Sequence, residues 1–189
     1  MGVAERKGRE RTEREHRITT AARLIAAGEG WSAVTIRRLA EVIEYSQPVL
    51  YSHFENKDAI VAAVAVEGFR ELAIALQQAA HGSTDRRTAI QNVAMAYLAF
   101  ASEHPALYEA MFTMPTALRF AEADTKSELK DAFAALAAVV TPLSGDVETA
   151  TETFWAALHG LAELERSGRI RHRARDERVA LVVDGLLQY

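Results

Sequence analysis

Residues 35–57, TIRRLAEVIEYSQPVLYSHFENK, decide the fold of the N-terminal part of this chain, because they predict two helices joined by a tight turn. From Ile36 to Ile43, apolar side chains recur at i, i+3, i+4 and i+7, the pattern of one buried helix face. Thr35 stands where the N-cap of this helix belongs, since its hydroxyl can accept a hydrogen bond from a free backbone N–H. The segment therefore predicts a helix-turn-helix.

The second helix of this pair has an outward face that suits contact with DNA. We expect the helix to begin at Pro48, because proline is tolerated only in the first helical turn. Leu50 and Phe54 are expected to point inward. The side chains left outside combine amide, methyl, phenol, hydroxyl and imidazole groups: Gln47, Val49, Tyr51, Ser52 and His53. Such a set can read base edges, and the helix N-terminus can face a phosphate. An ordinary surface helical hairpin is the alternative.

The same stretch resembles the DNA-binding segment of the TetR family of bacterial transcription regulators. The family pattern is matched over residues 16–65 by Thr35, by Leu39-Ala40, by LYSHF at residues 50–54 and by Lys57. One position departs from it, because Glu44 stands in the turn where the family usually has glycine. A left-handed backbone at this position would cost a non-glycine residue about 1 kcal/mol.

The resemblance implies a role for each residue of the predicted interface. It assigns base-edge contacts to Arg37 and Gln47, and apolar base contacts to Pro48 and Val49. It assigns phosphate contacts to Thr35, Tyr51, His53 and Lys57. The full set of expected DNA-binding residues is Thr35, Arg37, Ser46, Gln47, Pro48, Val49, Tyr51, Ser52, His53 and Lys57.

Composition restricts the function further. The 189 residues are 49% hydrophobic and include no cysteine, which excludes disulfides, a thiol nucleophile and Cys-based metal sites. The net charge of −4 is unevenly distributed: residues 1–57 hold ten Lys and Arg against eight Asp and Glu, and residues 58–189 hold twelve against eighteen. The basic balance is therefore local to the predicted DNA-binding part. No signal peptide or membrane span is evident, so we expect a cytoplasmic protein.

The pattern along the chain predicts an all-α protein with three parts. Residues 1–15 form a charged N-terminal arm, either disordered or a frayed helix extension, with a minor-groove role as an alternative. Residues 16–57 form a three-helix DNA-binding domain, and residues 58–189 form a helical ligand-binding and dimerisation domain. Proline and glycine divide the helices expected after residue 56, which span about 56–80, 85–103, 105–112, 125–141, 146–167 and 176–187.

A small-molecule site is expected in this second domain. Trp155 and His159 are four residues apart and share a helix face, and with Gly160 they resemble the C-terminal domain of one TetR subgroup. Aromatic and methionine side chains cluster near the helix breaks at Pro105 and Pro115. The expected ligand-binding residues are Tyr97, Phe100, Met111, Phe112, Met114, Phe133, Trp155 and His159. A core histidine without a ligand role is an equal alternative for His159.

Two further features concern the C-terminal helices. Six arginines between residues 166 and 178 are best interpreted as a solvated loop, and an anion or cross-subunit site is the alternative. The helices expected at about 146–167 and 176–187 are predicted to pack against their copies as a four-helix bundle. Part of the seam is expected at Phe154, Leu158, Leu161, Leu181, Val182 and Leu186.

Together these features indicate a homodimeric, sequence-specific regulator of transcription rather than an enzyme. We expect a near-palindromic double-stranded operator and a small apolar or amphipathic effector that releases a repressor from it. No cofactor, metal site or catalytic constellation is predicted, since the histidines lack ligand spacing and the common nucleophile motifs are missing. The alternative is a helical protein-interaction or architectural DNA-binding protein with no small-molecule effector.

Overall fold

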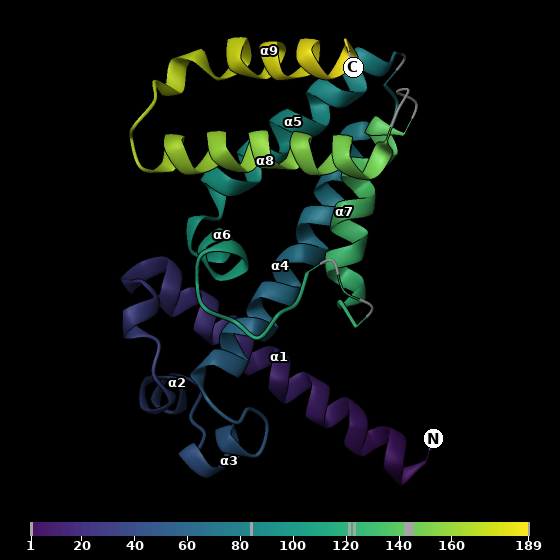
Figure 1. The fold of residues 1–189 in the computed structure, drawn as a ribbon. Helices are drawn as coiled ribbons and strands as arrows, with labels where there is room; N and C mark the ends of the chain where they lie inside the picture. Colours follow the sequence, from purple (N-terminus) through teal and green to yellow (C-terminus); the bar gives the residue numbers. More distant parts are fainter. Residues whose placement is uncertain (1, 84, 121, 123, 142–145, 189) are drawn as a thin grey trace. The chain divides into compact units, whose positions relative to one another are not determined.

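The computed structural model describes residues 2–83, 85–120, 122, 124–141 and 146–188. Within these ranges the chain forms α-helices and short 3-10 helices and no β-strand (Figure 1), which confirms the predicted all-α class. The elements are α1 (Val3–Glu29), η1 (Trp31–Ala33), α2 (Ile36–Val42), α3 (Gln47–Tyr51), α4 (Lys57–Ala80), α5 (Arg86–Glu103), α6 (Pro105–Phe112), α7 (Ser127–Val140), α8 (Val147–Arg166), η2 (His172–Ala174) and α9 (Arg175–Leu187). None of these helices is long and apolar enough to cross a membrane.

Side-chain caps explain where several helices begin. Asn56 Oδ1 accepts a hydrogen bond from the Ala59 N–H at 2.9 Å, and Asp85 Oδ1 accepts one from the Thr88 N–H at 2.9 Å. Asp146 caps α8 in the same way. Each cap satisfies a backbone donor that the first helical turn leaves free. The observed helices therefore lie within one or two residues of the predicted ranges; the breaks expected at Pro142 and Gly145 lie outside the described residues.

The chain divides into two compact units, Met1–Gly68 with Ala106–Arg119, and Phe69–Pro105 with Phe120–Tyr189. The first unit contains α1, η1, α2, α3 and the beginning of α4. Its core includes Ile18, Leu39, Leu50 and Ile60, all with no exposed surface. The domain limits predicted at residues 15, 57 and 58 stay predictions.

The N-terminal arm is part of α1 in this structure. The helix runs without interruption from Val3 to Glu29 and ends at Gly30, whose φ of 81° favours glycine. An ion pair between Arg11 Nε and Glu15 Oε1, 2.8 Å apart, joins successive turns of the arm. Of the two forms expected for the arm, the helix extension is the one observed from Val3 onward.

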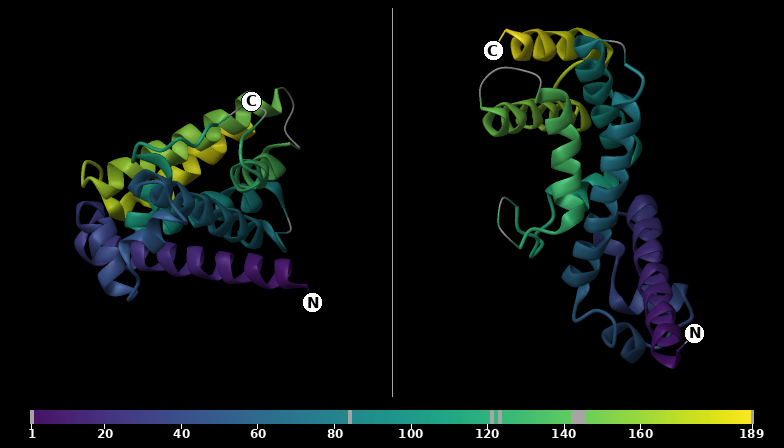
Figure 2. Two further views of the ribbon diagram at one scale, coloured as in Figure 1. Left: turned by 90° about the horizontal axis from the view of Figure 1, so that it is seen from below. Right: turned by 90° about the vertical axis from the view of Figure 1, so that its right-hand side faces the viewer.

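In the second unit, α5 is the central helix. It packs against α7, α8 and α9, and α8 also packs against α7 and α9. Figures 1 and 2 show α8 and α9 side by side and antiparallel. Large side chains of this unit with at most 1% exposed surface include Tyr97, Leu98, Phe154 and Leu158. Burial on this scale supplies the main stabilisation of such a helical unit.

Candidate nucleic-acid interface

The turn between α2 and α3 has a defined backbone geometry. Thr35 Oγ1 accepts a hydrogen bond from the Arg38 N–H at 3.1 Å, which confirms the predicted cap of α2. At the other end, Glu44 adopts a φ of 57°, and the Tyr45 N–H donates to the Ala40 carbonyl at 3.0 Å. This is the 6→1 hydrogen bond of a Schellman motif, with Glu44 in the left-handed position that usually holds glycine. The chain therefore keeps the standard turn and accepts the strain of a side chain within it.

α3 begins one residue earlier than predicted. The helix starts at Gln47, with Ser46 as its N-cap residue and Pro48 in its first turn, so the prediction of a start at Pro48 is wrong by one residue. Proline is tolerated at either of the first helical positions because both N–H groups there lack a helical acceptor. Leu50 has no exposed surface and anchors the short helix to the core, as predicted.

Most of the predicted DNA-binding side chains form an exposed surface on α2 and α3. The Arg37 side chain is 80% exposed, with Nε 3.0 Å from Glu41 Oε1, and Tyr51 is 54% exposed. Val49 is half-buried, between the exposed Pro48 and the buried Leu50. The other exposed residues of the predicted set are Thr35, Ser46, Gln47, Pro48 and Ser52. This surface offers guanidinium, amide, phenol and hydroxyl groups, which can donate to bases and phosphates.

His53 does not point outward, and that expectation is wrong. Only 6% of its side chain is exposed, and Nδ1 lies 3.3 Å from Glu15 Oε1 on α1. The imidazole is therefore a contact between α1 and the residues that follow α3. Sequence reasoning placed His53 outside because a five-residue helix shows too few positions to separate its faces.

Lys57 has a structural contact of its own. Its Nζ donates to the Trp31 carbonyl at 2.5 Å, and Trp31 Nε1 donates to the Ala106 carbonyl at 2.8 Å. Both side chains thereby connect η1 to its neighbours in the first unit. An ammonium group has three donors, so this contact leaves others for a phosphate.

The predicted ligand-binding residues are divided between the two units. Met111, Phe112 and Met114 belong to the first, and the other five belong to the second: Tyr97, Phe100, Phe133, Trp155 and His159. In the second unit, Trp155 Nε1 donates to the buried Tyr97 hydroxyl at 3.0 Å. The structure therefore brings Trp155 and Tyr97 together, and their role in ligand binding stays a prediction.

Phe120 was not among the predicted residues but joins the same aromatic group. Its ring centroid lies 6.3 Å from that of Trp155 and 5.6 Å from that of Phe69, and 41% of its surface is exposed. A lone aromatic residue in a polar connection, FAEADTK at residues 120–126, is the sequence signal that could have indicated it. His159 is half-buried, and burial lowers the pKa of its imidazole despite the opposing charge of Glu163.

The predicted dimer seam is wrong in part. Phe154, Leu158 and Leu186 are at most 8% exposed within one chain, so they belong to the core of the second unit. In contrast, Leu181 on α9 is 71% exposed, and Leu164 on α8 is 38% exposed. Both helices are amphipathic with broad apolar stripes, and the periodicity alone did not show which edge faces the core.

Family models match both parts of the chain. A model described as bacterial regulatory proteins, tetR family, matches residues 18–64, which include the helix-turn-helix. A second, described as tetracyclin repressor-like, C-terminal domain, matches residues 90–186. The fold and the turn between α2 and α3 define a helix-turn-helix protein. The protein belongs to the TetR family of bacterial transcription regulators, as the resemblance implied.

Similar proteins agree with this assignment. An HTH-type transcriptional regulator of Mycobacterium tuberculosis is 31% identical over 143 residues, and one of Bacillus subtilis is 37% identical over 95 residues. The matches cover 74% and 49% of this chain, and the chain spans 64% and 48% of the length of these relatives.

Solved structures share the fold at lower identity. A protein from Rhodococcus sp. RHA1 has a TM-score of 0.74 at 23% identity, with 92% of this chain and 93% of that chain covered. The TetR family regulator PfmR from Thermus thermophilus has a TM-score of 0.62 at 18% identity, with 91% and 97% covered. At these identities the likeness supports the fold alone.

Proposed function

We propose that the protein is a homodimeric repressor in the cytoplasm that binds a near-palindromic operator and is released by a small molecule. The observation that carries the proposal is the exposed surface of α2 and α3, where the side chains of Arg37, Gln47 and Tyr51 are accessible to DNA. One such surface is too small for specific recognition. Two copies in a symmetric dimer would reach half-sites about one helical turn apart, roughly 34–36 Å.

Arg37 is the main base-reading residue of this proposal. Arg37→Ala should cost about 1–3 kcal/mol on the cognate site and relax the preference at one base pair. Tyr51→Phe removes one phosphate donor instead and should weaken cognate and scrambled DNA alike. Gel-shift titrations with the gene's own upstream region measure both. Equal cognate-to-scrambled ratios for wild type and Arg37→Ala would remove Arg37 as a base reader.

Lys57 is proposed to contribute one phosphate contact. Lys57→Ala should weaken all sequences and reduce the slope of log affinity against log salt by about one. Because Nζ also donates to the Trp31 carbonyl, urea unfolding is measured in parallel to separate stability from binding. An unchanged salt slope in a folded variant would contradict the role.

The dimer is proposed to form through the exposed edge of α8 and α9. Leu181 and Leu164 are exposed there, and a Cβ added at Gly160 or Gly185 would meet nothing within 4 Å in the same chain. A second copy packed at these glycines would bury this surface. Leu181→Glu should therefore give a monomer in sedimentation velocity, and Leu24→Glu on α1, 69% exposed, is the control that should stay dimeric. A wild-type monomer at micromolar concentration would refute the proposal.

The effector is proposed to be a small apolar or amphipathic molecule bound near Trp155 and His159. An aromatic group that contains one polar anchor matches the usual composition of a ligand site. A metabolite panel in a thermal-shift assay should contain a stabilising compound, because ligands that bind the folded state raise its stability. His159→Ala should then alter the response to that compound and leave operator affinity unchanged. A variant that only loses stability would identify His159 as a core histidine.

A further inference from the structure

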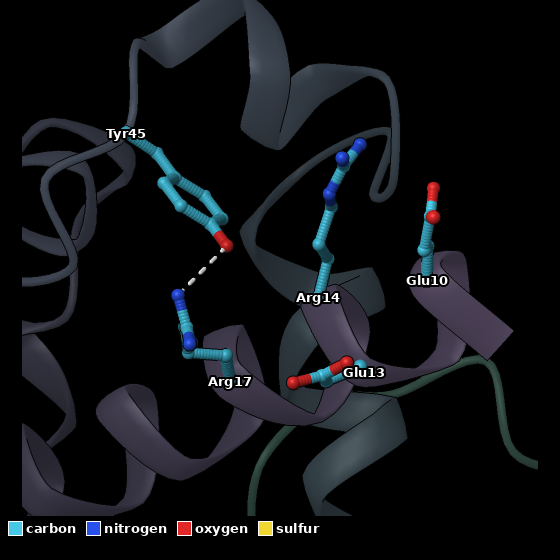
Figure 3. Close-up of a pocket in the computed structure, with 5 residues that line it drawn as sticks. All are labelled: Glu10, Glu13, Arg14, Arg17 and Tyr45. Carbon is cyan, nitrogen blue, oxygen red and sulfur yellow. Dashed lines mark hydrogen bonds between the residues drawn. The ribbon is translucent and has the colours of Figure 1, made fainter. Parts of the chain in front are cut away.

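The arm of α1 and the turn before α3 form a charged hollow that the predicted interface did not include. It has a volume of about 200 Å³ and is lined by Glu10, Glu13, Arg14, Arg17 and Tyr45 (Figure 3). The first four residues lie on one face of α1, and Tyr45 comes from the Schellman turn. We propose that this hollow binds one backbone phosphate of double-stranded DNA outside the surface of α2 and α3.

The hollow is built by tertiary structure. Arg17 Nη1 donates to the Tyr45 hydroxyl at 3.3 Å, across 28 positions of sequence. Two residues earlier on α1, Glu15 holds the His53 imidazole. These contacts fix the arm to both ends of α3, so the guanidinium and phenol groups are held in place before DNA arrives. Such preorganisation reduces the entropy lost on binding.

Arg14 supplies the free cation. It lies one turn before Arg17 on the same face of α1, and among the described residues its guanidinium has no hydrogen-bond or ion-pair partner. Figure 3 shows the Arg14 head group and the Tyr45 ring on the same side of α1. A guanidinium is always charged, and its planar fork matches two phosphate oxygens. The Tyr45 hydroxyl can add a neutral donor while it accepts from Arg17.

Two carboxylates also line the hollow, and they limit which anion fits. Glu10 lies 3.7 Å from Arg6, so its charge is partly compensated there. In Figure 3 the Glu13 carboxylate lies beneath the Arg14 backbone, away from the Arg14 guanidinium. The two carboxylates and two guanidinium groups leave the hollow nearly neutral, so a free anion would bind there only weakly. A DNA phosphate differs, because Arg37 and its neighbours already hold the DNA close to the hollow and one further contact is enough.

The position of the hollow favours DNA as the partner. Figure 1 and the right-hand view of Figure 2 show the N-terminal end of α1 and α3 at the same end of the first unit. Tyr45 directly precedes Ser46, the N-cap residue of α3. A phosphate bound here would therefore flank the bases that α3 contacts. This inference rests on the proposed operator binding.

Arg14→Gln tests the site, with Lys7→Gln as a matched control. Lys7 is an exposed cation on the same helix, two turns away and outside the hollow. Arg14→Gln should reduce the slope of log affinity against log salt by about one. The loss of affinity between 50 and 200 mM salt should therefore be roughly three- to fourfold smaller for the variant than for wild type. Cognate and scrambled DNA should be affected equally, and Lys7→Gln should change the slope much less. Equal effects of both variants would show diffuse charge and overturn the proposed site.

Phosphate ethylation interference locates the contact. Ethylation of one phosphate per half-site should weaken wild-type binding and leave Arg14→Gln unaffected at that position. Tyr45→Phe should weaken the same interference, because it removes a donor to that phosphate. If every ethylation pattern of Arg14→Gln matches wild type, the inference is wrong although operator binding stands. Failure of the wild-type protein to bind its upstream DNA would instead refute the proposed function.

Discussion

Glu165→Gln should be among the most destabilising single changes in the second unit. The Glu165 side chain is only 4% exposed and accepts hydrogen bonds from two arginines. Arg175 donates through Nε at 2.8 Å and Nη2 at 2.6 Å, and Arg178 donates through Nη2 at 2.6 Å. The carboxylate thus connects the C-terminal end of α8 to the beginning of α9.

The expected loss of stability follows from the charged groups that Glu165→Gln would leave unpaired. A glutamine at this position leaves two guanidinium groups without their counter-charge, and 14% and 19% of the arginine side chains are exposed. Removal of one partner from a buried ion pair typically costs 3–5 kcal/mol, and partial access to water reduces this. We expect a loss of about 3 kcal/mol in the free energy of unfolding.

The pH dependence gives an independent check. Burial alone would raise the pKa of the Glu165 carboxyl, but hydrogen bonds from Arg175 and Arg178 outweigh it and lower the pKa below its usual value. A lowered pKa stabilises the fold above the unfolded-state value of about 4.3, and this contribution is lost as pH falls through the folded-state pKa. The difference between wild type and Glu165→Gln should therefore be largest near pH 7 and shrink below about pH 4.

Urea unfolding followed by Trp155 fluorescence measures this loss. The chain has two tryptophans, so a Trp31→Phe background makes the signal specific for the second unit. Glu163→Gln is the matched control, because its ion pair with Arg166 on the same helix is 30–37% exposed and should contribute at most about 1 kcal/mol. A loss for Glu165→Gln no larger than that of Glu163→Gln would refute the reasoning.

Three substitutions that introduce or replace a glycine test the backbone geometry of the first unit. Each is measured by urea unfolding followed by Trp31 fluorescence. Glu44→Gly should raise stability by about 0.5 kcal/mol, because relief of left-handed strain exceeds the added chain entropy; a loss would contradict the strain. Gly68→Ala should lower stability by about 1–3 kcal/mol, since its Cβ would lie 2.6 Å from Met111 Sδ. Gly28→Ala has open space within α1 and should gain up to about 1 kcal/mol. Equal effects at these two glycines would refute the close approach at Gly68.

Much of the fold could be predicted because the helix limits have local causes. Thr35, Asn56, Asp85 and Asp146 cap helices in the structure, and each is visible in the sequence as a polar residue before an apolar-periodic run. The motif also located the turn at Glu44, which was expected to be either strained or differently shaped, and the structure has the left-handed, strained form. These features depend on residues within five positions of each other.

The errors concern contacts between distant residues. The arginines between 166 and 178 were interpreted as a solvated loop, but Arg175 and Arg178 bind Glu165, ten and thirteen positions away. Arg175 and Arg178 reach Glu165 only because the chain turns back through η2. Hydrophobic periodicity in the sequence does not predict this turn. His53 was misplaced for the same reason, because its partner Glu15 lies 38 positions away.

These distant contacts also explain how α3 keeps its geometry. A five-residue helix is unstable alone, since helix formation needs many more residues to offset its nucleation cost. Leu50 is buried and anchors α3 to the core. The residues on either side of the helix contact α1, because Tyr45 accepts a hydrogen bond from Arg17 and His53 contacts Glu15. The orientation of α3 therefore depends on α1, so substitutions there can alter DNA affinity without any contact to DNA. The arm is in this sense both a support for α3 and, by our proposal, an extension of the DNA-binding surface.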